Sequence, residues 1–269
     1  MKTYNRDERH FNGYRRLILV GNGFDLALGL KTNYSDFVLD YLKRCAKECI
    51  GSGKCINHLV HWELTDVNVL IGFLEELDEC ENVADFMSAA AEKINTNVNK
   101  SNLPNLFTSI IWSYSGSNWV GIEALYYDIL QYYLKDLQRT PYDRKNYLSV
   151  VKLNDQLDEL TSELKMYLKR ITNGLRFNKM DSPFYYLMQG LYAPLKSSDY
   201  EKVWKDEEVT LPDDIMFLNF NYTKTLFQIM DHEKATQVHI HGSIYELNNP
   251  IVFGYGDDTS KFSRVRIRG

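Results

Sequence analysis

The stretch from Leu17 to Asp25 reads LILVGNGFD. Its first four residues form a short aliphatic run, which is typical of a strand buried in a parallel sheet. The run ends at Gly21, and the segment from Phe24 to Leu30 is compatible with the start of a helix. A strand that passes through Gly-x-Gly into a helix predicts an α/β unit of the kind that binds nucleotides.

Short apolar runs return near the other end of the chain. They lie at Asp214–Leu218, Gln237–Gly242 and Pro250–Asp258, and each run ends in glycine or polar residues. Strands of an α/β sheet end in this way at the carboxyl edge, where such sheets bind their ligands. The two ends of the chain are therefore predicted to build one Rossmann-like parallel sheet of the α/β class.

The residues between these two ends are mostly helical in pattern. Besides a first helix at Ser35–Cys49, apolar side chains recur at helical spacing in four further segments. These segments are Val67–Leu77, Glu123–Leu137, Leu153–Leu175 and Met180–Leu195. The pattern predicts a nucleotide-binding core of residues 14–55 and 210–269, interrupted by a large α-helical insertion of residues 56–209.

Composition narrows the class of protein. The chain has 269 residues, 44% of them hydrophobic, which is enough to bury a substantial core. A net charge of −5 argues against a dedicated nucleic-acid binder. Residues 1–16 lack the apolar stretch of a signal peptide, and no segment approaches the roughly 20 apolar residues that span a bilayer. We therefore expect a soluble cytoplasmic protein without a membrane or nucleic-acid partner.

Two smaller features favour structural explanations. The four cysteines have no histidine pair at zinc-finger spacing, so buried or idle thiols are favoured over a metal site. Basic residues gather only near the end of the chain, where a solvated stretch is favoured over a phosphate-binding tail. The cysteines are Cys45, Cys49, Cys55 and Cys80, and the basic residues are Lys261, Arg264, Arg266 and Arg268.

The glycine turn is the first candidate ligand site. Gly21 and Gly23 lack a Cβ and permit close approach to the backbone, so a phosphate could face the amides there. The alternative is a tight turn without a ligand, because Leu26 occupies the place of the third glycine in the full nucleotide-binding pattern. Asp25 either binds a ribose hydroxyl or caps the following turn, and capping is favoured. Gly29 fits a second bend.

Two pairs of polar residues follow the later strands. Asn219 and Asn221 offer amide donors and acceptors that suit a carboxamide, a ribose or a water, although asparagine is also common where strands end. His241 precedes Gly242, which allows a sharp turn that exposes the imidazole for proton transfer. For His239 an ordinary strand histidine is favoured. A metal-dependent nuclease would instead combine these histidines with Asp257 and Asp258.

Taken together, these segments resemble the AbiH family of abortive-infection proteins. The resemblance covers most of the chain in order. Its anchors are the residues 17–26, Gly29-Leu30, Tyr34-Ser35-Asp36-Phe37, Trp119, Glu123, the run 218–223, the run 239–242 and the run 253–256. It implies an anti-phage defence protein.

The same anchors resemble, remotely, the nucleotide-binding core of sirtuins. Asn221 falls on the asparagine of the T-x-N-x-D motif, and His241-Gly242 falls on the catalytic His-Gly. The resemblance implies that Asn221 and His241 are catalytic. It also implies an NAD site made by Gly21, Asn22, Gly23, Phe24, Asp25, Gly29, Asn219, Thr223, Gly242 and Gly254, with no metal.

The chain departs from the sirtuin pattern at several places. Thr223 stands where the motif has aspartate, Asp25 where sirtuins have serine, and Tyr255 where they have glutamate. The residues from Gly242 to Pro250 are too few to hold a zinc ribbon and include no cysteine. These departures argue against protein deacylation.

The leading hypothesis is therefore hydrolysis of NAD at the nicotinamide–ribose bond. One alternative is a nucleotide-sensing module without turnover, which would signal to a protein partner or a second copy of the chain. The other is the metal-dependent nuclease.

Overall fold

The computed structural model describes residues 15–65, 72–96, 105–116, 121–139, 144–175, 183–194, 212 and 214–253. They divide into two compact units. The sheet unit comprises Met1–Leu30 with Ile171–Pro250, and the helical unit comprises Lys31–Arg170 with Ile251–Gly269. The core and insertion boundaries expected from the sequence stay a prediction.

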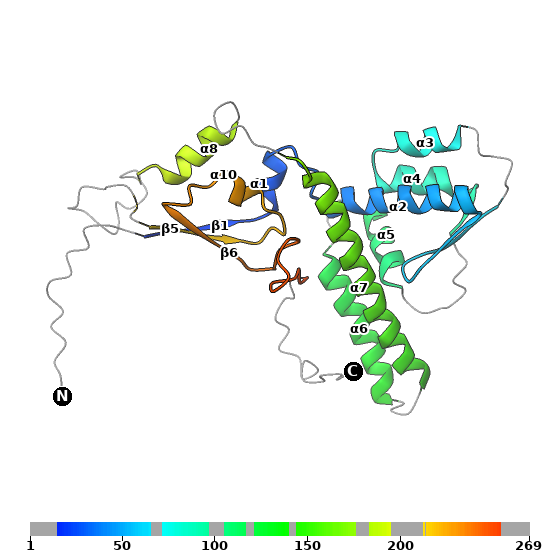
Figure 1. Ribbon diagram of the computed structural model, residues 1–269. Helices are drawn as coiled ribbons and strands as arrows, with labels where there is room; N and C mark the ends of the chain where they lie inside the picture. The colour runs from blue at the N-terminus through cyan, green and yellow to red at the C-terminus, as the bar shows by residue number, and fades with distance from the viewer. Residues whose placement is uncertain are drawn as a thin grey trace. The chain divides into compact units, whose positions relative to one another are not determined.

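Three parallel strands form the centre of the sheet unit (Figure 1). They are β1 (Arg15–Val20), β5 (Asp214–Asn219) and β6 (Ala235–His239), in the order β1-β5-β6. The register pairs Val20 with Asn219 and Asn219 with His239, so the three carboxyl ends lie level at one edge. The predicted mixed α/β class and the parallel pairing of the two chain ends are confirmed.

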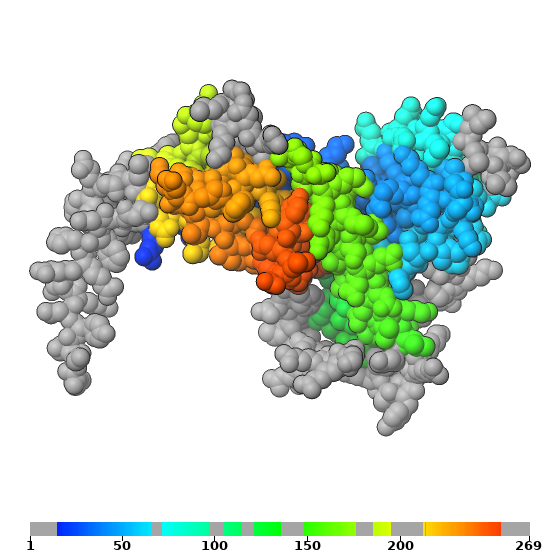
Figure 2. Space-filling view, viewed as in Figure 1, coloured from blue at the N-terminus to red at the C-terminus, as the bar shows by residue number. Residues whose placement is uncertain are grey.

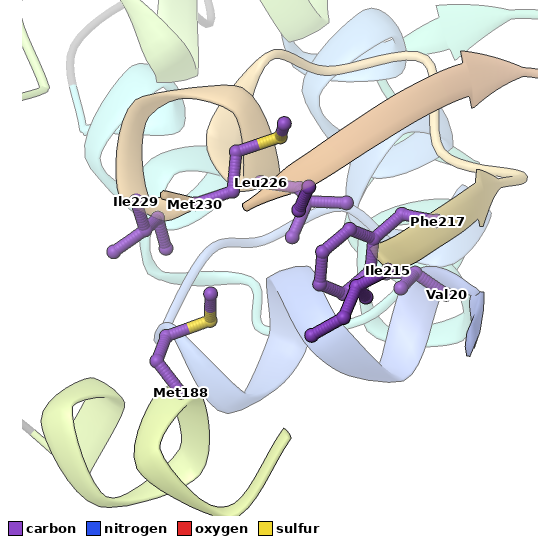
Figure 3. Close-up of a cluster of buried hydrophobic side chains, with 8 residues drawn as sticks. Val20, Met188, Ile215, Phe217, Leu226, Ile229 and Met230 are labelled. Atoms are coloured by element: carbon purple, nitrogen blue, oxygen red, sulfur yellow. The ribbon is translucent and has the colours of Figure 1, made fainter. Parts of the chain in front are cut away.

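One face of this sheet carries the core of the unit. Buried side chains from the sheet meet side chains from α8 (Pro183–Tyr192) and α10 (Thr225–Ile229), and α1 (Asn22–Ala27) contributes Phe24 at the margin. Alternation along β1 and β5 directs every second residue to this face. The members labelled in Figure 3 are Val20, Met188, Ile215, Phe217, Leu226, Ile229 and Met230.

The opposite face of the sheet corrects one expectation from the sequence. The run Leu17–Val20 is typical of a fully buried strand, yet Leu17 is 60% and Leu19 is 67% exposed. Met216 and Val238 on the neighbouring strands are also exposed. The run is apolar on both faces, but the buried side chains that the structure describes around this sheet gather on one face. Figure 2 shows residues of β5 and β6, drawn yellow to orange, reaching the visible surface.

Leu19→Ser is therefore expected to change the free energy of unfolding by about 0.5 kcal/mol or less, as surface substitutions do. Val20→Ser is the matched control in the same strand, because Val20 is buried and belongs to the core. That change is expected to cost about 2 kcal/mol or more, since it removes buried methyl groups and buries a hydroxyl. Urea unfolding of both variants measures the difference, and equal costs would contradict it.

The last apolar run is not a strand where the structure describes it. Residues 251–253 have no regular secondary structure, and the residues after them lie outside the described part of the chain. Pro250 comes back against Gly242 instead, and Ser243 N donates to Asn249 O at 2.8 Å. Pro250, the first residue of the run, therefore belongs to a loop that returns to Gly242.

The helical unit is built on α2 (Tyr34–Ser52), which buries seven side chains along one face. Four more helices of this unit are α3 (Phe73–Glu79), α4 (Val83–Ala90), α5 (Leu106–Gly116) and α6 (Ile122–Arg139), and most of α7 (Arg144–Thr172) also belongs to it. The helices predicted from the sequence correspond to α2, α6, α7 and α8. Of the predicted helix Val67–Leu77, residues 73–77 lie in α3, and residues 66–71 lie outside the described part of the chain. Among the described residues no helix combines the length and apolar character needed to cross a bilayer.

A small antiparallel sheet in the helical unit is absent from the sequence predictions. It joins β2 (Lys54–Ile56), β3 (His61–Leu64) and β4 (Ile94–Asn95). Gly53 ends α2 with a φ of 83°, and Asn57 Oδ1 accepts from the amides of Leu59 and Val60 to form the turn between β2 and β3. The strands are too short for their alternation to stand out in a helical region.

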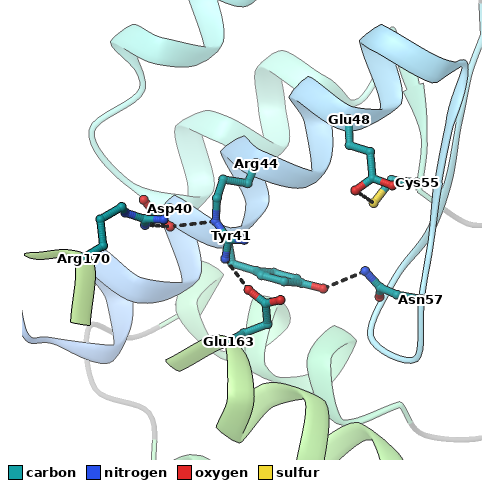
Figure 4. Close-up of polar contacts among 8 residues, drawn as sticks. All are labelled: Asp40, Tyr41, Arg44, Glu48, Cys55, Asn57, Glu163 and Arg170. Carbon is teal, nitrogen blue, oxygen red and sulfur yellow. Dashed lines mark hydrogen bonds and ion pairs between the residues drawn. The ribbon is translucent and has the colours of Figure 1, made fainter. Parts of the chain in front are cut away.

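Polar contacts tie α2 to α7 and to the β2–β3 turn (Figure 4). Arg44 bridges Asp40 and Glu163, and Arg170 also reaches Asp40. These groups are partly exposed, so each pair contributes little by itself. In the turn, Asn57 Nδ2 donates to the hydroxyl of the buried Tyr41 at 2.9 Å.

The cysteines of the helical unit agree with the expectation of buried thiols. Cys45, Cys49 and Cys55 are buried, and Cys80 is partly exposed. Contact with Cys55 and burial raise the pKa of Cys45, and burial raises the pKa of Cys49 to about 11. The thiols of Cys45 and Cys49 are therefore protonated at neutral pH and are poor nucleophiles.

Candidate functional site

The glycine turn (residues 21–23), the asparagine turn (residues 219–222) and the histidine pair (His239 and His241) meet at the carboxyl edge of the sheet. Phe220 N donates to Val20 O at 2.8 Å, and Ile240 N donates to Asn219 O at 2.9 Å. These bonds continue the strand pairing by one residue beyond β5 and β6. Segments from opposite ends of the chain are thereby adjacent in space, as the sequence predicts.

The glycine turn itself is uncovered. Gly21, Asn22 and Gly23 are exposed, and a Cβ added at Gly21 or Gly23 would meet no atom of the described residues within 4 Å. Gly29 makes the predicted second bend with a φ of 74°. A ligand could therefore approach the backbone of the turn directly. Binding by Gly21, Asn22, Gly23, Phe24 and Gly29 stays a prediction.

The asparagine turn is held by its own side chain. Asn219 Oδ1 accepts a hydrogen bond from Asn221 N at 3.0 Å. Both asparagines are buried, and the Nδ2 atoms of their side chains have no hydrogen-bond partner among the described residues. Buried polar groups are nearly always paired, so two neighbouring exceptions point to a partner that is not part of the described chain.

His239 is a structural histidine, as the sequence favours. Its Nδ1 lies 3.1 Å from Asn221 O, and its Nε2 lies 2.6 Å from Gln237 Nε2. A carbonyl oxygen only accepts, so Nδ1 carries the proton, and Nε2 accepts from Gln237 when the ring is neutral. Both ring nitrogens are engaged, and a metal on His239 would have to displace one of these bonds.

His241 lies in a different environment. Its ring contacts Phe220 edge-on at 5.3 Å between centroids and Tyr222 at 6.4 Å. The residue is partly exposed. Phe220, which contacts the His241 ring, also bonds through its backbone N to Val20 O at the end of β1. An imidazole in this position can exchange a proton with a bound molecule.

Gly242 fixes the direction of the chain after His241. Its φ is 81°, and a Cβ on this residue would lie 2.0 Å from Pro250 O. Ile244 N donates to Tyr222 O at 3.0 Å, and Asn249 Nδ2 donates to His239 O at 3.3 Å. The loop after β6 is thus fastened to the asparagine turn.

Asp25 corrects another expectation. Its carboxyl group does not cap the following turn but is buried and bonded to two threonines. Thr223 Oγ1 donates to Asp25 Oδ2 at 2.6 Å, and Thr225 Oγ1 donates to Asp25 Oδ1. The two hydroxyls lie 3.0 Å apart. Ligand contact by Asp25 or Thr223 stays a prediction, and the structure shows them bonded to each other.

Thr225 is a member of this site that the sequence analysis does not single out. It follows Asn221 and Thr223 at alternate positions. That spacing is a weak but usable signal, because polar residues at alternate positions can share one side of an extended segment.

Burial raises the pKa of the Asp25 carboxyl, and hydrogen bonds from Thr223 and Thr225 offset part of the rise. The neutral form is thus favoured in the folded protein more than in the unfolded chain. The resulting stability is fully present below the ordinary pKa of 3.8 and is lost as the pH rises through the higher folded value.

Asp25→Asn removes this loss because the amide stays neutral. The stability of the variant relative to the original protein should therefore improve as the pH is raised from about 4 to about 8. Urea unfolding of both proteins at several pH values in this range measures the trend. The difference in the free energy of unfolding between the two proteins could instead stay constant with pH or change in favour of the original protein. Either result would contradict a raised pKa for Asp25.

Some predicted residues lie outside the part of the chain that the structure describes. They are Trp119, Gly254, Tyr255, Asp257, Asp258 and the basic residues from Lys261 onward. Within the described part no three His, Cys, Asp or Glu side chains gather in a way that could hold a metal ion. The nuclease hypothesis depends on Asp257 and Asp258 and stays a prediction.

Comparison with protein families gives a match over nearly the whole chain. The family described as "Bacteriophage abortive infection AbiH" matches residues 17–267. This range contains the glycine turn, the asparagine turn and the histidine pair. No curated protein and no solved structure matches the chain.

Proposed function

The chain belongs to the AbiH family of bacteriophage abortive infection proteins, and we propose that in this role it binds NAD at the carboxyl edge of its sheet and hydrolyses the nicotinamide–ribose bond. Family membership implies the role in anti-phage abortive infection. The ligand, the reaction and the sirtuin-like arrangement are our proposal.

One observation carries the proposal. Asn219 and Asn221 each bury an amide Nδ2 that has no partner among the described residues. Such a group costs about 1–3 kcal/mol unless something accepts its hydrogen bonds. Ribose hydroxyls and the nicotinamide carboxamide oxygen are acceptors of the right kind. We assign them to these two amides, with the pyrophosphate over the uncovered turn at Gly21 and Gly23.

The proposed reaction needs no strong nucleophile from the protein. As the bond between the ribose and nicotinamide breaks, its electron pair leaves with nicotinamide and positive charge develops on the sugar, as in other glycosyl transfers. A water oxygen then bonds to the anomeric carbon, and its proton passes to His241, which releases it to solvent. The products are nicotinamide, ADP-ribose and one proton. Asn221 orients the ribose and the water.

A test of the proposal combines binding and turnover. Calorimetry of the purified chain with NAD should show saturable binding, and chromatography should show nicotinamide and ADP-ribose in equal amounts. Asn221→Ala removes one donor and should weaken binding by roughly tenfold, which corresponds to about 1.4 kcal/mol. Absence of both binding and nicotinamide release in the original protein would remove the proposal.

Nucleotide sensing without turnover is the second candidate. It is favoured by Thr223, which stands where the sirtuin motif has aspartate and which donates its hydroxyl hydrogen bond to Asp25. Binding of NAD in the calorimeter with no nicotinamide release would select this function over hydrolysis.

A further inference from the structure

A buried carboxyl group meets two hydroxyl groups beside the asparagine turn. Thr223 Oγ1 donates to Asp25 Oδ2 at 2.6 Å, although the two residues are 198 positions apart in the sequence. Thr225 Oγ1 donates to the other oxygen of the same carboxyl group. The proposed reaction gives none of these three residues a task, so their contact needs its own explanation.

The contact is closed to solvent. Asp25 and Thr223 are each 1% exposed, and Thr225 is 2% exposed. Water cannot replace a lost partner in such a place, and a group left unpaired there costs free energy. Replacing Asp25 alone leaves hydroxyls without their acceptor, and placing aspartate at position 223 alone puts two carboxyl groups together.

An exchange of the two groups would conserve the chemistry of the contact. Either order joins one carboxyl to one hydroxyl. The number of bonds that separate the two α-carbons through this hydrogen bond also stays the same, because the aspartate side chain is one bond longer than that of serine or threonine. Thr225 is bonded to Asp25 and lies 3.0 Å from Thr223, so a carboxyl at either position would have Thr225 as a second partner.

The loop that ends at Thr223 also carries Asn221. Three bonds hold its backbone: Asn221 N to Asn219 Oδ1, His239 Nδ1 to Asn221 O, and Ile244 N to Tyr222 O. The contact with Asp25 fastens the remaining end of the loop to α1. The loop is thus fixed on both sides of an amide that has no partner among the described residues.

We propose that Asp25 and Thr223 form an exchangeable carboxyl–hydroxyl pair that holds the side-chain amide of Asn221 in its ligand-binding orientation. Asp25 is then a positioning residue that acts through Asn221 and does not touch the ligand. The inference rests on the proposed NAD site, since that proposal gives Asn221 its ligand.

The test exchanges the two groups. The variants are Asp25→Ser, Thr223→Asp and the double variant with both changes. Each single variant should lower NAD affinity at least about tenfold at a temperature where it is folded, and the double variant should recover to within about threefold of the original protein, as coupled neighbours do. Thr223→Val and Thr223→Ser form a milder series, in which serine retains the hydroxyl and should keep the affinity that valine loses.

A second readout does not depend on NAD. The side-chain amide signal of Asn221 in NMR spectra, assigned by its loss in Asn221→Ala, should shift in Asp25→Ser and Thr223→Val and return in the double exchange and in Thr223→Ser. If NAD does not bind, the proposed function fails while this readout still tests the pair.

Two results would overturn the inference. One is a double variant that is no better than the single variants. The other is a set of single variants that lower the melting temperature but leave the Asn221 signal and the NAD affinity unchanged, because that result would give the pair a purely structural role.

Discussion

His241→Ala is expected to lower the rate of NAD hydrolysis by about 10²–10⁴-fold, the usual contribution of a general base. The ring of His241 lies against Phe220 beside the end of β1, whereas both ring nitrogens of His239 are engaged by the protein. The affinity for NAD should change little, because the proton transfer belongs to the transition state. Steady-state release of nicotinamide at several NAD concentrations separates the two effects.

His232→Ala provides the matched control. His232 is exposed, contacts Phe227 and precedes the amino end of β6, so it lies away from the carboxyl edge. This variant should keep the original rate. Equal turnover in the His241 variant and the original protein would remove His241 from the mechanism, and equal losses in both variants would show that histidine replacement acts through folding.

Gly242→Ala is expected to destabilise the sheet unit by about 2–5 kcal/mol. A left-handed φ costs a non-glycine residue about 1–2 kcal/mol, and forcing a contact with backbone adds about 1–3 kcal/mol. Here the φ is 81°, and the new Cβ would lie 2.0 Å from Pro250 O and 2.9 Å from Asn249 O. Both are backbone atoms, so the loop after β6 would have to move. Urea unfolding measures the loss.

Gly29→Ala is the matched control, because it separates the cost of a positive φ from the cost of a close contact with the added Cβ. Gly29 also has a positive φ of 74°, but within the part of the chain that the structure describes a Cβ there would meet no atom within 4 Å. Its replacement should cost only the conformational part, about 1–2 kcal/mol. If Gly242→Ala costs no more than Gly29→Ala, the close approach of Pro250 does not constrain position 242.

The fold is predictable where the pattern is strong. The run at Leu17–Val20 with its glycine turn indicates β1, and the runs that begin at Asp214 and Gln237 indicate β5 and β6, which the structure pairs in one parallel sheet. The small sheet of β2, β3 and β4 escapes prediction because its strands are only two to four residues long. Periodicity cannot identify elements of that length.

The candidate site is predictable in its residues but not in their contacts. Asparagine, histidine and glycine at strand ends are residue types that serve ligand sites, so Asn219, Asn221, His241 and Gly242 stand out. The partner of Asp25 is a different matter. The sequence suggests that Asp25 either caps a turn or binds a ligand. In the structure its carboxyl group instead forms buried hydrogen bonds with Thr223 and Thr225. Alternate spacing marks Thr225 only weakly, and its meaning depends on a residue from the other end of the chain.

Local residue types and their order along the chain were enough to identify the family, the mixed α/β class and the three turns that end the strands. The pairing of the polar groups depends instead on the folded molecule, because hydrogen bonds and burial join residues from distant positions. Asp25 meets Thr223, Asn221 meets His239, and Gly242 meets Pro250. Only the folded structure shows that Asp25 is buried and that the side-chain amides of Asn219 and Asn221 are buried without a partner in the described chain.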